Sequence, residues 1–287
     1  MKPPPFEYRA VRHVEEVVEH LARYGTDAKI LAGGQSLIPM MKLRLIRPAL
    51  LIDINPLHSL NHVRLSSGYL AVGATARVRE LESADVRNCC PLVSAAAAHV
   101  GHAPIRNRGT VCGSLAHADP AAELPLVAVC LDAEFEAQGP GGRRTIAARE
   151  FFRSYFTTAL AAEEVLVEVR LRMMPPEAGW AFMELSKRAG DFALAAAAVI
   201  LERGSSGTIR HARLALGAIA DRPIRCWDAE KALVNQEATP DVFRAAAAAA
   251  TDALDPPSDV HGSGKYRRHV ARVLLERALL EAWSRAR

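Results

Sequence analysis

The chain has 287 residues, of which 50% are hydrophobic, and a formal net charge of only +4. A chain of this length can bury most of the apolar surface that its unfolded form exposes, in one large domain or in two smaller ones. Lys and Arg are scattered, no five like charges follow one another and aromatic residues are sparse, so the sequence argues against nucleic-acid binding.

The sequence also argues against export and membrane insertion. Residues 1–10 contain three consecutive prolines and no apolar segment of a signal peptide. The longest apolar stretches, such as residues 193–201, are far shorter than the roughly 20 residues of a membrane-spanning helix. The five cysteines are odd in number and lack motif spacing, which predicts reduced thiols in a cytoplasmic protein. They also lack any spacing known to hold an iron–sulfur cluster.

The first part of the chain is predicted to mix helices and strands. Apolar residues at helical spacing predict a helix through Val14, Val17, Val18 and Leu21. Further helices are expected at residues 37–43, 77–83, 92–100 and 121–129, strands at 29–32, 50–54 and 69–74, and a polar turn at 105–109. At residues 165–171 every second residue is Val or Leu, which predicts a strand with one apolar face.

The pattern changes around residues 174–176, which read Met-Pro-Pro. Three strands are predicted after this point, at 180–185, 192–201 and 212–219, followed by helices at 228–235, 241–254 and 266–287. Strands followed by helices indicate a separate α+β unit. We therefore place a domain boundary near residue 176.

The first motif with chemical content is Ala-Gly-Gly-Gln-Ser at residues 32–36, between a predicted strand and a predicted helix. Consecutive glycines let a backbone adopt left-handed angles and approach a ligand closely. Successive N–H groups then form an anion-binding nest, and the start of the following helix and the hydroxyl of Ser36 add donors. For an isolated pair of glycines, a plain tight turn is the more common explanation.

A second motif, Arg-Gly-Thr-Val-Cys-Gly-Ser at residues 108–114, again combines small residues with hydroxyl donors. Two such loops in one chain can clamp a diphosphate from both sides. Neither loop matches Gly-x-Gly-x-x-Gly, so the sequence does not predict a Rossmann dinucleotide site. Residues 262–265, Gly-Ser-Gly-Lys, superficially resemble a P-loop, but Asp259 replaces its first glycine and Tyr266 follows the lysine. We reject that motif.

Other polar residues near these motifs have ordinary structural explanations. Asp119 is expected to be the N-cap of the helix at 121–129. His117 either donates to a ligand or caps a neighbouring carbonyl. Cys112 is interpreted as a small buried thiol and not as a redox group. Structural roles are also expected for Asp53, His99 and His102. No Ser-His-Asp or metal-ligand arrangement follows from the spacing.

With these motifs, the chain resembles the FAD-binding medium subunit of the carbon monoxide dehydrogenase and xanthine dehydrogenase family, the molybdenum hydroxylases. The similarity includes residues 32–44, 106–125, 187–193 and 261–267, in family order over about residues 5–280. It implies an α+β protein with a vanillyl-alcohol-oxidase-type FAD-binding domain at 1–175 and a C-terminal domain at 176–287. The first domain is expected to consist of two α/β subdomains, at about 1–57 and 58–175, and the second of an antiparallel sheet with helices.

The resemblance also implies a set of cofactor contacts. Residues 32–36 and 110–114 are expected to hold the FAD pyrophosphate, Glu123 to lie near the ribityl or ribose group, and residues 187–191 to approach the isoalloxazine. The cofactor-binding residues implied are Ala32, Gly33, Gly34, Gln35, Ser36, Thr110, Val111, Cys112, Gly113, Ser114, Glu123, Leu166, Lys187 and Asp191. The family often has Thr-Ile-Gly-Gly in the second motif, and Cys112 replaces the first of those glycines.

In this family a large molybdopterin subunit oxidises the substrate and a small subunit holds two [2Fe–2S] clusters. The flavin subunit passes the electrons to an external acceptor. The resemblance therefore implies an electron-transfer subunit in a dimer of heterotrimers, with no catalytic or metal-binding residues of its own. Two alternatives stay open. One is a free-standing FAD-dependent oxidoreductase with its own organic substrate, and the other is a non-catalytic nucleotide-binding module.

Overall fold

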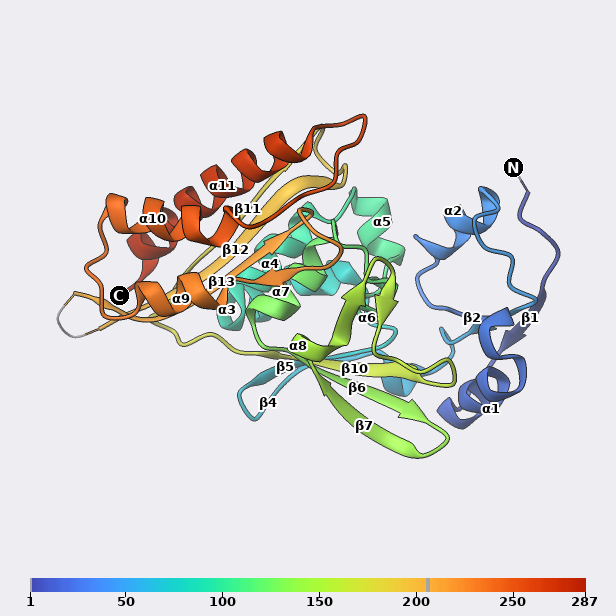
Figure 1. The fold of residues 1–287 in the computed structure, drawn as a ribbon. Coiled ribbons are helices and arrows are strands. Elements are labelled where there is room, and N and C mark those ends of the chain that lie inside the picture. The colour runs from blue at the N-terminus through green and yellow to red at the C-terminus, as the bar shows by residue number, and fades with distance from the viewer. Residues whose placement is uncertain (1, 205–206) are drawn as a thin grey trace.

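The computed structural model describes residues 2–204 and 207–287. Figure 1 shows a small N-terminal lobe beside a larger body, in which helices lie between two sheets. The lobe is a three-stranded parallel sheet in the order β1-β3-β2 with two helices. Its elements are β1 (Glu7–Ala10), α1 (Val14–Tyr24), β2 (Ala28–Leu31), α2 (Leu37–Lys42) and β3 (Leu50–Asp53).

Helix α1 forms where the sequence predicts it. Its buried residues are Val14, Val17, Val18 and Leu21, so the predicted apolar face is confirmed. The carboxylate of Glu16 accepts a hydrogen bond from the backbone N–H of His13 at 3.1 Å, which satisfies a donor at the helix start.

The body of the molecule begins with a five-stranded antiparallel sheet in the order β4-β5-β10-β6-β7. Its strands are β4 (Val63–Ser66), β5 (Tyr69–Gly73), β6 (Glu134–Gly139), β7 (Gly142–Ala147) and β10 (Val165–Arg172). The central strand β10 is buried on both faces, because the helices that connect β5 to β6 cover one of them. These helices are α3 (Ala84–Cys89), α4 (Pro91–His99), α5 (Ala103–Arg108), α6 (Val111–His117) and α7 (Glu123–Cys130).

Short elements complete this part of the chain. They are the 3-10 helices Gly25–Asp27, His58–Leu60 and Val78–Glu82, helix α8 (Ala148–Phe151), and the small hairpin of β8 (Phe152–Ser154) and β9 (Thr157–Thr158).

The C-terminal part is a four-stranded antiparallel sheet in the order β11-β12-β13-β14, covered by three helices. Its elements are β11 (Gly179–Ser186), β12 (Ala193–Arg203), β13 (Ile209–Gly217), β14 (Ile224–Arg225), α9 (Trp227–Leu233), α10 (Pro240–Thr251) and α11 (Gly264–Arg285). The predicted order of strands followed by helices is confirmed.

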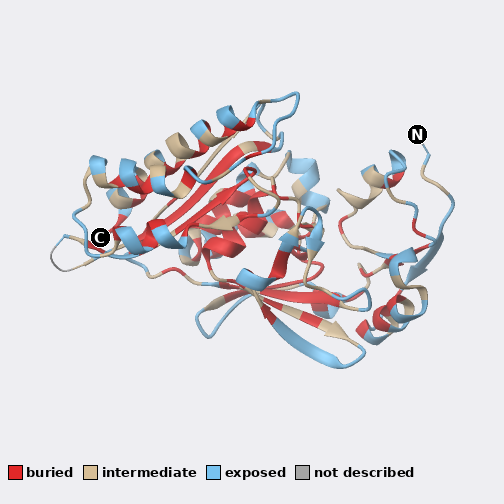
Figure 2. Ribbon diagram, viewed as in Figure 1, coloured by how far each residue is buried: buried red, intermediate tan, exposed pale blue. Residues whose placement is uncertain are grey.

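Strand β12 joins two hydrophobic cores because successive side chains of a strand point to opposite faces. One face packs against α9 to α11 and consists of Ala195, Ala197, Val199 and Leu201. The other face packs on the helices of the preceding part and consists of Ala196, Ala198 and Ile200. Figure 2 shows the result, in which α4 and α7 are buried between the two sheets while α11 keeps an exposed outer face.

Three local predictions are wrong. The polar turn expected at 105–109 is mostly helix α5, whose sequence has no apolar period to indicate a helix. Residues 111–114, expected in a loop, form the first turn of α6. Asp119 is not the N-cap of α7, because Ala122 takes that position. Instead the Asp119 carboxylate accepts from the N–H of Ala121 at 2.9 Å, two residues further on, as in an Asx turn.

Candidate functional site

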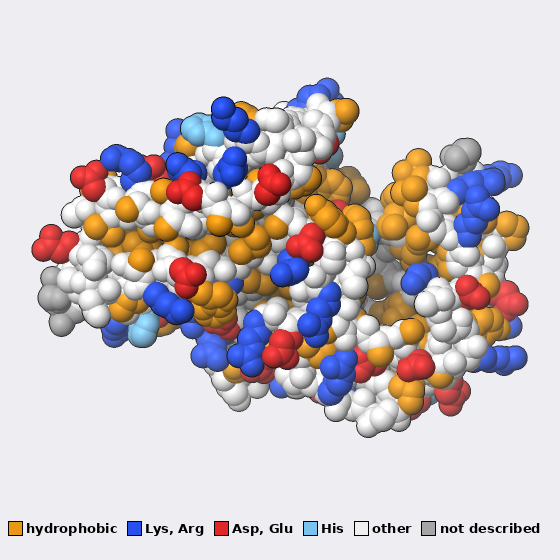
Figure 3. Space-filling view, in the orientation of Figure 1, with side chains coloured by type: hydrophobic (Ala, Val, Ile, Leu, Met, Phe, Trp, Pro, Cys, Tyr) orange, Lys and Arg blue, Asp and Glu red, His pale blue; other side chains and the backbone are white. Residues whose placement is uncertain are grey.

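A cavity of about 980 Å³ lies between the N-terminal lobe and the body. Figure 3 shows the molecular surface hollowed between these two parts. Ligand pockets commonly measure about 300–1,000 Å³, so this cavity has room for a ligand of dinucleotide size. Its wall includes both glycine motifs, together with parts of β2, β9 and β10 and the loop before β12.

The first glycine motif contacts the second through Gly33. A Cβ atom at this position would lie 2.5 Å from the carbonyl oxygen of Arg108 and 2.9 Å from the nitrogen of Thr110. Residue 33 must therefore be glycine for the two motifs to touch. The left-handed conformation expected for the motif occurs at Gly34, where φ is 72°, and not at Gly33.

Backbone donors of both motifs are free within the part of the chain that the structure describes. No protein group there accepts a hydrogen bond from the N–H of Gly34, Gln35 or Ser36 in the first motif. In the second motif the same holds for the N–H groups of Thr110 and Cys112. These two sets of donors are suited to bind phosphate oxygens.

Thr110 organises the second motif by capping α6. Its hydroxyl accepts from the N–H of Gly113 at 3.2 Å, and its carbonyl accepts from the N–H of Ser114 at 3.1 Å. A Cβ atom on Gly113 would lie 2.5 Å from that hydroxyl, so glycine at 113 leaves room for the cap. The motif is thus a capped helix start and not the open loop that the sequence suggested.

Arg77 and Asn55, which the sequence did not indicate, connect the two motifs. The Arg77 guanidinium donates to the carbonyl of Arg108 and to the Asn55 side-chain oxygen, both at 2.6 Å. The Asn55 amide in turn donates to the carbonyl of Ala32 at 2.9 Å. Asp53 holds Asn55 by accepting from its backbone N–H at 2.9 Å, so the turn role expected for Asp53 is confirmed.

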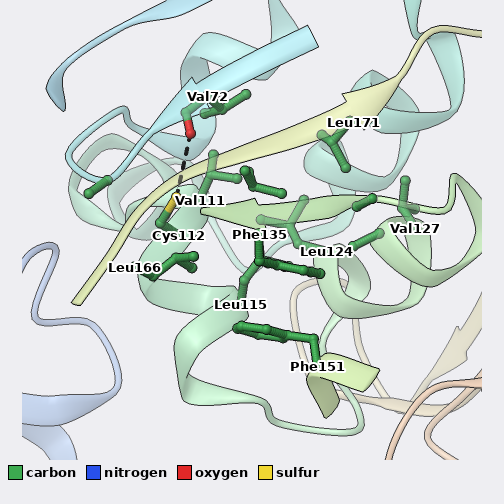
Figure 4. Packing of buried hydrophobic residues seen from close by; sticks show 14 of the residues in the cluster. Val72, Val111, Cys112, Leu115, Leu124, Val127, Phe135, Phe151, Leu166 and Leu171 are labelled. Carbon is green, nitrogen blue, oxygen red and sulfur yellow. Dashed lines mark hydrogen bonds between the residues drawn. The ribbon is translucent and has the colours of Figure 1, made fainter. Parts of the chain in front are cut away.

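Cys112 belongs to the cavity wall, but its thiol packs into the core. Its thiol donates to the carbonyl of Val72 at 3.5 Å, and Figure 4 shows it among the buried side chains of the first core. Burial raises the pKa of this thiol, which keeps it protonated and unreactive. The expectation of a buried thiol is confirmed. The adjacent Val111 is also buried in this core and does not line the cavity.

His117, at the end of α6, lies in the cavity wall with its ring centroid 5.0 Å from that of Phe156. Burial lowers its pKa, which favours the neutral imidazole. Within residues 2–204 and 207–287 its ring makes no hydrogen bond to a carbonyl, so the capping role is not seen.

The remaining expected site residues separate into two groups. Glu123 and Leu166 are buried in the cavity wall, and Asp191 lies at its edge. Burial, above all, raises the pKa of Glu123 to about 7. Lys187 is exposed and lies outside the wall. The structure therefore brings all the expected site residues to one cavity except Val111 and Lys187.

The charges of the wall are mostly negative. Within the described ranges, its charged side chains are those of Lys29, Asp119, Glu123, Glu164 and Asp191. A single lysine cannot neutralise a diphosphate among these acids, so phosphates in this cavity have to be bound mainly by the free backbone N–H groups. The same ranges hold no group of three or more His, Cys, Asp or Glu residues arranged for a metal ion, and no helix long and apolar enough to cross a bilayer.

Comparison with known families accounts for both parts of the chain. Residues 4–172 match the family described as the FAD binding domain in molybdopterin dehydrogenase. Residues 180–282 match the CO dehydrogenase flavoprotein C-terminal domain. The chain belongs to the FAD-binding medium subunits of molybdenum hydroxylases. The resemblance inferred from the glycine motifs is confirmed.

Relatives of this flavoprotein subunit match over nearly their whole length. The 6-hydroxypseudooxynicotine dehydrogenase complex subunit alpha of Paenarthrobacter nicotinovorans is 43% identical, covering 100% of this chain and 97% of that protein. The carbon monoxide dehydrogenase medium chain of Hydrogenophaga pseudoflava is 38% identical, with 99% of each chain covered. The solved carbon monoxide dehydrogenase from Hydrogenophaga pseudoflava has a TM-score of 0.97 and 40% identity over 100% of both chains. The expected fold class is thereby confirmed.

FAD fits the cavity on the evidence of the donors in its wall. The free N–H groups of two motifs, brought together at Gly33, offer the anion-binding surface that a diphosphate requires. The cavity wall also extends to strand β10, where Leu166 supplies an apolar surface beyond the two motifs. The flavoprotein subunit therefore has both a phosphate-binding and an apolar part in one cavity.

Proposed function

We propose that this flavoprotein subunit takes electrons from the [2Fe–2S] clusters of a partner subunit and passes them to an external acceptor. The observation that carries the proposal is the contact of the two glycine motifs at Gly33, with free N–H groups on both sides, in one large cavity. FAD supplies the redox chemistry when it is bound.

The protein's contribution is to bind and orient the cofactor. The free N–H groups of the two motifs hold the diphosphate, namely those of Gly34, Gln35, Ser36, Thr110 and Cys112. Arg77 keeps the two motifs at a fixed separation. Glu123, Leu166 and Asp191 are assigned to the ribityl and isoalloxazine end, supported by their place in the cavity wall. The assignment of Val111 and Lys187 rests on the family resemblance alone. We assign residues 1–175 to an FAD-binding domain, which supplies most of the cavity wall, and residues 176–287 to a C-terminal domain, which adds Gly190, Asp191 and Phe192.

We further propose that the chain assembles with a large molybdenum subunit and a small iron–sulfur subunit, as a dimer of heterotrimers in the cytoplasm. Two [2Fe–2S] clusters need four ligands each, which five cysteines without motif spacing do not supply. The electrons therefore have to arrive from another polypeptide. The printed names of relatives, such as "complex subunit" and "medium chain", support membership of a larger assembly.

The test is a comparison of the native particle with the isolated chain. We expect protein taken from its source to contain FAD, molybdenum and iron, and its native mass to include two further kinds of subunit. The isolated chain should contain FAD without either metal, and should reduce artificial dyes without hydroxylating an organic substrate. A metal-free homo-oligomer that oxidises an organic substrate unaided would establish the free-standing flavoenzyme instead. A chain that binds no flavin would leave only the nucleotide-binding module.

A further inference from the structure

Three titratable side chains lie on elements that pack together, because α4 contacts both α7 and the strand β11 of the C-terminal sheet. Glu123 begins α7 and lines the cavity, Glu184 lies on β11 and His99 ends α4. The Nδ1 atom of His99 lies 3.2 Å from Oε1 of Glu184, and these side chains are 45% and 4% exposed respectively. Glu123 is 6% exposed. The half-exposed imidazole thus links the buried carboxyl group of Glu184 to solvent.

The second oxygen of Glu184 makes this cluster unusual. Oε2 is buried and has no hydrogen-bond partner within the described residues. A buried carboxylate oxygen without a donor is costly, and a bound proton relieves that cost. Glu123 carries a second carboxyl group close enough to interact electrostatically with Glu184 and His99. The charges of Glu184 and His99 therefore act on the proton affinity of Glu123.

Several charges on neighbouring elements act on Glu123. Burial raises its pKa most, and the carboxylates of Glu184 and Asp119 raise it further. A hydrogen bond from its own backbone N–H and the positive charge of His99 act in the opposite direction. The hydrogen bond to Glu184 is the main cause that raises the pKa of His99, while the partial burial of His99 acts to lower it.

A purely structural role explains only part of this arrangement. The pair of His99 and Glu184, together with the ring contact of His99 with Phe182 at 5.2 Å, does join α4 to β11. It does not explain why a second buried acid, Glu123, lies in the cavity wall within electrostatic reach of this pair, nor why one oxygen of Glu184 is left without a donor.

We propose that Glu123, Glu184 and His99 form a proton-binding cluster in the wall of the cofactor cavity, which takes up a proton from solvent when negative charge enters that cavity. This inference rests on the proposed function, because FAD is taken to carry the negative charge that enters the cavity. A proton moves from water, by way of His99, onto a carboxylate of the cluster. No electron moves within the cluster and no bond to the cofactor is formed. The added proton offsets the negative charge at close range, where the dielectric screening is weak.

The first test uses the cofactor-free chain, so it does not depend on FAD. Infrared difference spectra across pH report the protonated carboxyl band of Glu123, identified by its loss in Glu123→Gln. We expect the band to disappear at about pH 7 as the pH rises. Glu184→Gln should move this transition to lower pH and His99→Gln to higher pH, because they remove a negative and a positive neighbour. Glu150→Gln, at an exposed carboxylate on α8, is the matched control and should leave it unmoved.

A purely structural role of His99 and Glu184 does not predict that the two variants shift the Glu123 transition in opposite directions. If Glu123 titrates like an ordinary glutamate, at about pH 4.3, or if both variants leave its transition unmoved, the cluster does not exist.

The second test measures proton uptake on binding. Calorimetric titration of FAD into the apoprotein at about pH 7, in two buffers of different ionisation enthalpy, gives the protons bound with the cofactor. Wild type should bind protons together with FAD, and Glu123→Gln should bind fewer or none. FAD binding with no proton uptake in wild type would overturn the cluster. Absence of FAD binding, with the infrared titration intact, would instead contradict the proposed function.

Discussion

A Cβ atom on Gly33 would lie 2.5 Å from the carbonyl oxygen of Arg108. This is closer than real side chains approach a backbone, so the two glycine motifs touch only because residue 33 has no side chain. The same carbonyl accepts a hydrogen bond from Arg77, which fixes its position and leaves it little room to yield. Glycine at 33 therefore serves a close backbone contact, whereas the neighbouring Gly34 serves a left-handed turn.

Gly33→Val is expected to abolish FAD binding. The new side chain has to push the second motif away, and the N–H groups of the two motifs can then no longer bind one diphosphate. We expect flavin content to fall to about a tenth of wild type or less, which corresponds to ~1.4 kcal/mol or more in binding. The measurement is flavin absorbance per protein after gel filtration. Gly141→Ala is the matched control, because a Cβ atom there meets nothing within 4 Å. Unchanged flavin content in Gly33→Val would remove the first motif from the FAD site.

Arg77→Ala is expected to weaken FAD binding without unfolding the chain. The substitution removes two hydrogen bonds, to Arg108 and Asn55, that hold the motifs together. Hydrogen bonds of charged groups contribute ~1.5–3 kcal/mol, so a loss of about ten- to a hundredfold in affinity is expected. Fluorescence titration of the apoprotein with FAD measures it. Arg79→Ala, at an exposed arginine with one long 3.4 Å contact, should bind FAD like wild type. Equal affinities of the two variants would show that Arg77 does not position the site.

The sequence located the glycine motifs because glycine has a local signature, but it gave no sign of what holds them together. Arg77 acts on a carbonyl 31 positions away, and Asn55 on one 23 positions away. Both acceptors are backbone atoms, which no residue pattern marks. Pairings of this kind become visible only when the fold brings the segments together.

Secondary structure was predictable where one face is apolar and the other polar, as in α1. It was not predictable in α5, whose sequence Ala-Pro-Ile-Arg-Asn-Arg has no apolar period, nor in α6, whose small residues resemble a loop. The motif at residues 187–193 also did not reveal that Lys187 lies outside the cavity wall. Asp191, four residues later in the same motif, does line the cavity.

Cys112→Gly is expected to retain FAD and to lose stability. The thiol donates to the carbonyl of Val72 in the core, and the donor that residue 112 offers to the cavity is its backbone N–H, which glycine keeps. Removing a small buried side chain and placing glycine in α6 should together lower the free energy of unfolding by ~1–3 kcal/mol. Urea unfolding and FAD titration separate the two effects, and Cys112→Ala should give a smaller loss of stability. A complete loss of flavin reduction in Cys112→Gly would demonstrate a chemical role for the thiol.

Arg225 joins the C-terminal unit to the preceding part through a buried network. Its side chain is 6% exposed, pairs with the buried Glu230 and contacts Asp132 of the preceding part at 2.7 Å. It also donates to the carbonyl of Val129 at 3.0 Å, while Glu230 accepts from the backbone N–H of Leu214 at 2.7 Å. Both charges are therefore desolvated, and each depends on the other.

Arg225→Met is expected to lower the free energy of unfolding by ~3–5 kcal/mol, because it leaves the carboxylate of Glu230 buried without a cation. The double variant Arg225→Met with Glu230→Gln removes that charge as well, and should recover most of the loss. Asp132→Asn should cost less than ~1 kcal/mol, since Asp132 is 40% exposed and solvent screens its charge. Urea unfolding of the four proteins, with slopes compared, measures these differences. If the single and double variants are equally destabilised, the loss comes from the arginine's packing and its contact with Val129, and not from an unpaired charge on Glu230.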